Sequence, residues 1–363
     1  MRWILDHVNH RLRSAVNTSS KSEEDDRTEP YAEERDRFAV PNALACAYLD
    51  RRAGTQLTEP TVESYESQLR EFTTFLQNRS LSVVEAEFTD ILDYVEWCVN
   101  RGNRQSTIEG KLTTIKELYK FVRLRTEYGD ELSIDPIELE TLDLKRFNTP
   151  AEIEREALTR EELRRLFDAM DSYRNRLMAT VAAETGLRNS DLRNLRLTDV
   201  DLDGPSLHVR DPKNAVPYDV PFSHDLAFEL ELWCNQYRAA YGGAQHGEFV
   251  FPGQSNARIE TNEGLNQIVK TAAEKAGIQE TLAVSELTPA QQAVLQTNRE
   301  QREWHRVTVH TLRHTCLTLM KEADISLQYR QLVANHDPST TQRYSHGQEE
   351  EFATIREQYD PPR

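Results

Sequence analysis

Hydrophobic positions repeat with a helical period along the first half of the chain. In residues 61–79 the apolar side chains fall three and four residues apart, on one face of an amphipathic helix: Val62, Tyr65, Leu69, Phe72, Phe75 and Leu76. Residues 88–102 and 106–124 show the same period, and 40–52 predicts a shorter helix. No strand pattern interrupts them, so the sequence predicts a small helical domain over residues 40–145.

The pattern becomes mixed after residue 158. Helical periods recur at 159–170, 174–185, 191–197, 223–241, 261–277 and 310–334. Residues 206–211 and 217–222 alternate like two short strands joined by a turn, which predicts a β-hairpin. Residues 281–304 are polar and rich in Gln, and we read them as a partly helical insertion. The fold class expected is therefore mainly α with a small antiparallel β-hairpin or sheet.

Two stretches lack an apolar period and divide the chain. Residues 17–36 hold eight acids and three bases, so residues 1–39 are predicted to be an acidic, flexible segment. Residues 126–157 contain two prolines and many acids, and the linker itself is placed at 146–157. A second domain then runs over 158–363, with a C-terminal tail at 347–363.

Composition limits the class of protein. No apolar run is long enough to cross a bilayer, and the first residues lack the apolar centre of a signal peptide. We therefore expect a cytoplasmic protein with no membrane partner. The four cysteines are far apart and form no CxxC pair, which favours free thiols over disulfides or a metal site: Cys46, Cys98, Cys234 and Cys316.

The charge balance is acidic and poor in lysine. The chain has 61 acidic and 44 basic residues, a net charge of −17, and only 9 of the bases are Lys against 35 Arg. This composition is typical of a halophilic protein. In molar salt the Debye length is about 3 Å, so overall repulsion from DNA would be screened. Composition alone thus leaves open both a DNA-binding protein and an acidic protein without a DNA partner.

Histidine, arginine and tyrosine gather near the C-terminus. His310 and Arg313 lie three residues apart on one helix face, and His336 and Tyr344 follow. Such a group can be a metal site, an ordinary helical surface or a phosphate site. Zinc needs three or four ligands, and no Cys or Glu stands at the required spacing, so we expect no metal. The HxxR pair alone leaves a half-buried structural helix open.

Residues upstream of this group favour a phosphate site. Arg188 lies in a turn that enters a helix, where backbone N–H groups favour anions, and Lys213 lies at the hairpin tip. Four features, taken in order, resemble the conserved boxes of the tyrosine recombinase (phage integrase) family. They are TGLRNSDLRNLRLTDVD (185–201), Lys213 eight residues before Pro221, HTLRHT (310–315) and LVANHDPSTTQRYSH (332–346). The resemblance covers about residues 40–346.

The resemblance implies a fold and a reaction. It implies an N-terminal SAM-like core-binding domain and an α+β catalytic domain that acts as a site-specific DNA recombinase through a 3′-phosphotyrosyl intermediate. Tyr344 would be the nucleophile and His310 its base. Arg188 and Arg313 would bind the non-bridging oxygens, and Lys213 would be the general acid. No cofactor is implied; the implied partners are double-stranded DNA and a homo-tetramer assembled on it.

Two departures from the family pattern stand out. This chain has Ala334-Asn335-His336 where the family usually has Leu-Gly-His. His336 would donate a hydrogen bond to the phosphate, and Asn tolerates the left-handed conformation that Gly supplies at a helix end. The insertion at 281–304 is also unusual. It is either surface decoration or a contact to DNA or a neighbouring protomer.

Further predictions concern DNA contacts and the tail. A basic face around the third helix is either solvated or contacts DNA through Arg101, Arg104, Gln105, Lys111 and Lys116. The tail has an apolar stripe, which could pack on its own domain or dock on a neighbouring protomer: Phe352, Ile355 and Tyr359. We favour the exchange between protomers. His314 and His346 are assigned structural roles.

Two alternatives share the same residues. A type IB topoisomerase-like nicking–closing enzyme uses a similar catalytic set, although the separate helical domain and the tail favour a recombinase. A non-cleaving DNA-binding protein on the same fold is the other alternative, and it is hard to reconcile with all six polar positions being present.

Overall fold

The computed structural model describes residues 38–210, 217–287, 292, 298–334 and 348–359. The chain divides into two compact units. The first comprises Met1–Ile153 with Val284–Glu303, and the second Glu154–Ala283 with Trp304–Arg363. The insertion therefore groups largely with the first unit, although sequence analysis placed it in the second. Within the described residues, no helix is long and apolar enough to cross a membrane.

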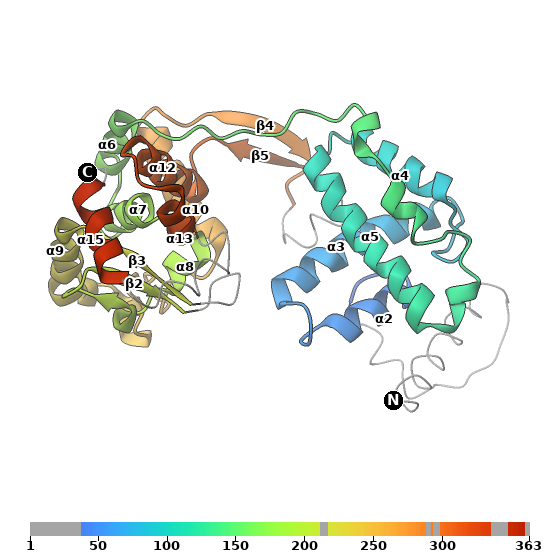
Figure 1. Ribbon diagram of the computed structural model, residues 1–363, viewed down its shortest axis with the longest axis horizontal. Coiled ribbons are helices and arrows are strands. Elements are labelled where there is room, and N and C mark those ends of the chain that lie inside the picture. The colour runs from blue at the N-terminus through green and yellow to red at the C-terminus, as the bar shows by residue number, and fades with distance from the viewer. Residues whose placement is uncertain (1–37, 211–216, 288–291, 293–297, 335–347, 360–363) are drawn as a thin grey trace. The chain divides into compact units, whose positions relative to one another are not determined.

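The first unit is helical, as predicted (Figure 1). It is built from α2 (Ala43–Arg52), α3 (Glu59–Gln77), α4 (Phe88–Asn100), α5 (Gln105–Arg125) and the 3₁₀ turns η2 (Glu127–Asp130), η3 (Glu138–Thr141) and η4 (Leu144–Arg146). Its core is aromatic: Phe72 lies edge-on to both Tyr94 and Tyr119. The 3₁₀ turns contribute Leu139 and Leu144 to this core, so the start of the acidic connection belongs to the packed unit.

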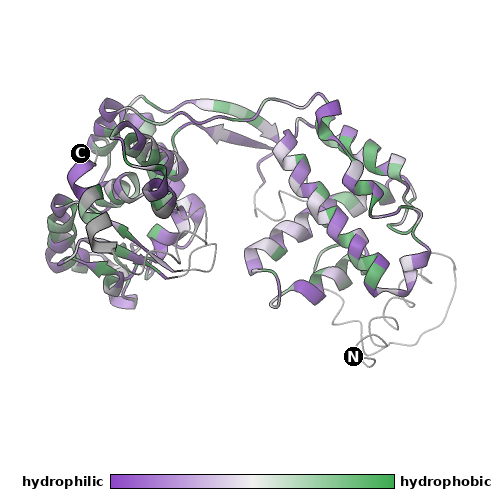
Figure 2. Ribbon diagram, viewed as in Figure 1, coloured by the Kyte–Doolittle hydropathy of each residue, from purple (hydrophilic) through white to green (hydrophobic). Residues whose placement is uncertain are grey.

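Helices surround a small sheet in the second unit. They are α6 (Arg160–Asp168), α7 (Tyr173–Thr185), α8 (Asn189–Asn194), η5 (Leu197–Asp199), α9 (His224–Leu232), η6 (Trp233–Tyr237), η7 (Arg238–Ala240), η8 (Gly242–His246), α10 (Asn262–Lys275), α12 (Val309–Glu322), α13 (Leu327–Ala334) and α15 (Gln348–Gln358). Helices α7 and α12 pack against each other at the centre. Figure 2 shows hydrophobic and hydrophilic residues interleaved along the helices, as expected for amphipathic elements.

The strands of the predicted hairpin, β2 (Ser206–Val209) and β3 (Tyr218–Pro221), belong to a three-stranded antiparallel sheet with β2 in the centre. The order of the sheet is β1 (Val200–Asp201), β2 and β3. Leu207 faces Val220 and Val209 faces Tyr218 across β2 and β3. These side chains are buried, so one face of the sheet packs on the core. The prediction of a mainly helical fold with a small antiparallel sheet is confirmed.

Three segments differ from the sequence prediction. The helix expected at 310–334 is two helices, because the chain turns at Asp324, which has a left-handed φ of 57°. The helix expected at 223–241 leaves α-helical geometry after Leu232 and continues as a π-helical turn. In the insertion, which was expected to be partly helical, residue 292 is helical but the described ends form unpredicted strands: β4 (Thr281–Glu286) pairs with β5 (Gln301–His305).

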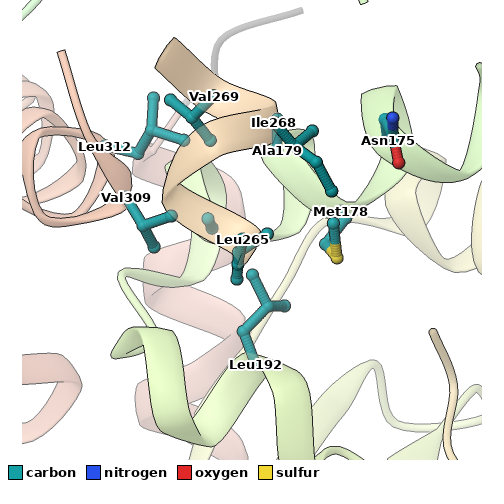
Figure 3. A pocket seen from close by; sticks show the side chains of 10 residues that line it. Asn175, Met178, Ala179, Leu192, Leu265, Ile268, Val269, Val309 and Leu312 are labelled. Atoms are coloured by element: carbon teal, nitrogen blue, oxygen red, sulfur yellow. The ribbon is translucent and has the colours of Figure 1, made fainter. Parts of the chain in front are cut away.

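Figure 3 shows a packing gap inside the second unit. It lies between α7, α8, α10 and α12, and its wall is almost entirely aliphatic, including Leu192, Leu265 and Leu312. The space does not admit a water molecule. It is a feature of the hydrophobic core and offers no ligand site.

Candidate active site

Arg188 is positioned by a tight turn between two helices. Helix α7 ends at Thr185, and Gly186 then adopts a left-handed φ of 62°. A Cβ at this position would lie 3.4 Å from the Cys316 sulfur, which is ordinary contact, so the left-handed φ is the reason that glycine is favoured here. Arg188 follows as the N-cap residue of α8, with an extended backbone. The turn thus directs Arg188 from the end of α7 towards α12 and α13.

Arg313 meets Arg188 at a shared acceptor. Arg313 projects from α12 and is 4% exposed. Its guanidinium donates hydrogen bonds to the backbone carbonyls of Gly186 and Ala334. Arg188 Nη2 donates to the same Ala334 carbonyl at 3.3 Å. Burial lowers the pKa of Arg313, and the nearby charge of Arg188 lowers it further. Two cationic forks from distant parts of the sequence therefore converge on one oxygen.

Asp191 is a buried carboxylate beside this pair. It is one turn along α8 from Arg188, and its Oδ2 lies 3.9 Å from Arg188 Nη1. Burial raises the pKa of Asp191, while Arg188 and Arg313 act in the opposite direction. In the sequence, Asp191 follows Arg188 by three residues, a spacing that places both side chains on one helical turn and allows an ion pair.

His310 lies in the first turn of α12 and is accessible to solvent. Partial burial of the imidazole lowers its pKa, and the positive charges of Arg313 and Arg155 lower it further. Arg155 Nε donates a 3.0 Å hydrogen bond to the carbonyl of His305. This bond keeps the Arg155 side chain near the start of α12. The neutral imidazole is thus favoured at neutral pH. Since a neutral imidazole can accept a proton, His310 meets the requirement for a base.

The other three predicted catalytic positions, Lys213, His336 and Tyr344, lie outside the described residues. The described chain leads up to them. Strands β2 and β3 flank the segment with Lys213, and α13 ends at Ala334, two residues before His336. Within the described residues, no group of three or more His, Cys, Asp and Glu side chains has an arrangement that could hold a metal ion.

Comparison with known proteins defines the family. The family model for the phage integrase family matches residues 156–351, more than half of the chain. The chain belongs to the phage integrase family. The model for the family's N-terminal SAM-like domain matches residues 48–126, within the first unit. The resemblance predicted from the arginine, histidine and tyrosine boxes is confirmed at the level of the family.

Curated relatives of this integrase-family chain are Xer recombinases. Tyrosine recombinase XerC of Staphylococcus haemolyticus is 25% identical over 294 residues, covering 79% of this chain and 86% of the relative. Tyrosine recombinase XerD of Pseudomonas putida is 25% identical over 311 residues, covering 84% and 92%.

Solved structures show the same fold. XerH site-specific recombinase bound to its difH substrate, in a pre-cleavage complex, has a TM-score of 0.57 at 15% identity, with 86% of this chain and 94% of that chain covered. The Tn1549 transposon integrase with transposon right-end DNA has a TM-score of 0.58 at 15% identity, with 84% and 94% covered.

The predicted DNA contacts of the SAM-like unit cluster at the α4–α5 turn. Arg101 lies over the Trp97 ring at 4.9 Å. Arg104 Nε donates to the Ala151 carbonyl at 2.9 Å, and Gln105 donates to Glu109 at 2.9 Å. Farther along α5, Lys116 pairs with Glu140 at 3.0 Å. These four residues are partly exposed, so their assignment as DNA contacts stays a prediction.

The structure contradicts the prediction that Lys111 contacts DNA. This lysine is 4% exposed, and its ammonium group pairs with buried Glu71 and donates to Asn103 Oδ1 at 3.1 Å. The Tyr94 hydroxyl donates to the same Glu71 carboxylate at 2.9 Å. The buried Glu71 carboxylate already neutralises this ammonium group, so its charge is not available to a DNA phosphate. Lys111 is a structural residue of the first unit, and we remove it from the candidate DNA contacts.

Replacing Lys111 with alanine is expected to lower the free energy of unfolding by about 3–5 kcal/mol, because Glu71 would remain buried without its counter-charge. Urea unfolding of the whole chain, followed by circular dichroism, measures the effect. Lys116→Ala is the control: its partner Glu140 is half exposed, so a loss below about 1 kcal/mol is expected. Equal losses in the two variants would contradict the buried-pair argument.

The C-terminal helix α15 packs on its own unit in this structure. Phe352, Ile355 and Tyr359 are all buried, and Arg356 Nη1 donates to the Pro205 carbonyl at 3.2 Å. Helix α15 lies against β3. The apolar stripe predicted from the sequence is therefore present and covered within one chain. Exchange between protomers, which the sequence analysis favoured, stays a prediction.

Proposed function

We propose that the chain is a site-specific DNA recombinase that cleaves and rejoins double-stranded DNA through a 3′-phosphotyrosyl intermediate. The observation that carries the proposal is the convergence of Arg188 and Arg313 on one acceptor, in a member of the phage integrase family. Two guanidinium forks are well matched to the oxygens of one phosphate. The names of its relatives, recombinases XerC and XerD, support the same reaction.

The chemistry assigned to the site is a transesterification. The Tyr344 oxygen attacks the scissile phosphorus, the bond to the 5′ oxygen breaks, and the tyrosyl phosphodiester keeps the bond energy for religation. Arg188 and Arg313 bind the non-bridging oxygens, where negative charge grows in the transition state. Lys213 protonates the departing 5′ oxygen. Attack by a 5′ hydroxyl on the phosphotyrosine reverses these steps and rejoins the DNA.

Two histidines complete the assignment. His310 accepts the phenolic proton of Tyr344, whose free pKa is about 10. His336 donates a hydrogen bond to the phosphate. The neutral imidazole favoured at His310 supports its role as base, because an imidazolium has no lone pair for the proton.

The cellular setting follows from the substrate and composition. We assign the protein to the cytoplasm, where its DNA substrate and reduced thiols are found. The net charge of −17 with only 9 lysines supports work in concentrated salt, where local arginine clusters govern DNA binding. On DNA we propose a homo-tetramer in which α15 passes to a neighbouring protomer. Arg101, Arg104, Gln105 and Lys116 are the proposed contacts of the SAM-like unit.

The test is a covalent protein–DNA adduct. A DNA site is first selected by repeated binding to a pool of random duplexes at high salt. The selected duplex, nicked near its centre as a suicide substrate, is then incubated with the protein and resolved under denaturing conditions. We expect a denaturant-resistant adduct and, with two intact sites, exchanged strands. Relaxation of supercoils without exchange would support the topoisomerase alternative, and binding without an adduct would support the non-cleaving one.

The pH dependence tests His310. Because the pKa of His310 lies below its ordinary value of 6.5, the imidazole is neutral at pH 7 and gains a proton only in more acidic solution. The rate of adduct formation should therefore be flat near neutrality and fall only in solution more acidic than the ordinary imidazole pKa of 6.5. His310→Gln is expected to slow the reaction about 10²- to 10⁴-fold and to remove this acidic limb.

His314→Gln is the matched control, since His314 lies one turn farther along α12 and has no assigned catalytic role. It should keep the rate at neutral pH and retain the acidic limb, moved to slightly higher pH because the His314 charge helps to lower the pKa of His310. An acidic limb that persists in His310→Gln would mean that another group is the base.

A further inference from the structure

Tyr218 brings an unassigned hydroxyl to the second unit. It is the first residue of β3, pairs with Val209 across the hairpin and is 3% exposed. The next residue, Asp219, points away and forms a 2.6 Å contact with His208 on the outer face of the sheet. Strand alternation thus sends Tyr218 inward, five residues after Lys213.

The Tyr218 hydroxyl lies among the charged groups of the arginine site. Burial is the main cause that raises its pKa to about 12; Asp191 raises it further, whereas Arg313 and Arg188 lower it. Strand β3 also packs against α13, whose last residue provides the carbonyl shared by the two arginines. The phenol is therefore a neighbour of Arg188, Arg313 and Asp191.

Among the described residues no acceptor takes the proton of this hydroxyl, and the Arg313 side chain can only donate towards its oxygen. The Asp191 Oδ2 atom is also without a hydrogen bond there, so the two groups are not bonded to each other. A buried hydroxyl without a partner costs about 1–3 kcal/mol. Such an arrangement is expected where a ligand supplies the missing partner.

The chemistry of the neighbours defines that partner. A guanidinium group can only donate, so Arg188 and Arg313 cannot accept the phenolic proton. A group that fits two guanidinium donors and one hydroxyl donor must accept hydrogen bonds and carry negative charge. A phosphate oxygen meets both conditions.

We propose that Tyr218 is a further phosphate-contacting residue, whose hydroxyl donates a hydrogen bond to a non-bridging oxygen of the scissile phosphate beside Arg313. The inference rests on the proposed function and adds a residue to its site. The phenol keeps its proton throughout, so no charge moves. A buried phenol with a raised pKa is poorly suited to attack phosphorus, which separates the role of Tyr218 from that of Tyr344.

Tyr218→Phe is the decisive variant. Loss of one hydrogen bond to a charged group should slow adduct formation on the selected suicide duplex about 10- to 100-fold. Affinity for the intact duplex should change by less than about threefold, because many other phosphate contacts supply it. Removing a buried hydroxyl whose proton has no acceptor should leave the urea midpoint of unfolding unchanged or higher.

Tyr173→Phe is the matched control. Its hydroxyl bonds to Glu229 at 2.9 Å in the same unit, and its charged neighbours do not include the arginine pair. This variant should cleave at the unchanged rate. Phosphorothioate duplexes give a second measure, because sulfur accepts hydrogen bonds poorly. The slowing caused by sulfur in one stereoisomer should shrink in Tyr218→Phe.

Each outcome bears on one claim. If the unchanged protein forms the adduct and Tyr218→Phe forms it equally fast, the inference is overturned and the proposed function stands. The inference is also overturned if slower cleavage is accompanied by lower stability, or if both sulfur stereoisomers behave as in the unchanged protein. If the unchanged protein forms no adduct on any selected duplex, the proposed function fails and the inference fails with it.

Discussion

Replacing Tyr344 with phenylalanine is expected to abolish the covalent protein–DNA adduct while leaving DNA binding intact. The substitution removes one oxygen, the atom that forms the bond to phosphorus, so no phosphotyrosyl intermediate can arise. Phenylalanine keeps the aromatic ring and differs from tyrosine only by the missing hydroxyl. The measurement compares adduct formation on the nicked duplex with affinity for the intact duplex, at the same salt concentration.

Tyr329→Phe is the control for this experiment. Tyr329 lies on α13, the last described helix before the segment that contains Tyr344, and packs against the core of the second unit. It should form the adduct at the unchanged rate. An adduct that survives in Tyr344→Phe but disappears in Tyr329→Phe would show that the nucleophile has been assigned to the wrong tyrosine.

The second large effect is expected for Arg188→Lys. Lysine keeps the positive charge but replaces a planar fork with a single ammonium group. The bond from Arg188 to the Ala334 carbonyl and the ion pair with Asp191 both depend on the spread of the guanidinium nitrogens. We expect DNA affinity within a few fold of the unchanged protein and cleavage slower by about 10²- to 10³-fold.

Arg164→Lys provides the comparison, because Arg164 is largely exposed and paired only with Glu161 three residues earlier. It should alter neither affinity nor cleavage. If Arg188→Lys cleaves as fast as Arg164→Lys, then charge alone suffices and bidentate binding by Arg188 is not part of the mechanism.

Helices with a strong apolar period were predictable from sequence. Residues 61–79 gave α3 and 106–124 gave α5, because each buries one continuous stripe. Helix α6 begins with a capping box of Thr159 and Glu162, whose spacing can be read from the sequence. The break between α12 and α13 was missed, since Asp324 adopts a left-handed turn without the usual Gly or Pro signal. Strand pairing in the insertion depends on contacts between distant residues, which its polar sequence does not reveal.

In the candidate site, too, some residues were predictable from the sequence and others were not. Family motifs placed Arg188 and Arg313 in one site, and the structure brings them to a common acceptor. Lys111 was wrongly predicted to contact DNA, although its spacing from apolar residues indicates a buried position. It lies three residues after Ile108 and four before Ile115, on the buried face of α5. Tyr218 was missed because its environment arises only when β3, α8 and α12 come together.

The buried pair of Lys111 and Glu71 has a practical consequence for handling the protein. Dissolved salt weakens charge interactions through the surrounding water, and side chains only 5% and 6% exposed meet little of it. Dissolved ions reach more exposed pairs such as Lys116–Glu140 and weaken their attraction. Buffer composition can therefore be varied to adjust how strongly the acidic surface repels DNA, while this internal contact of the first unit stays the same.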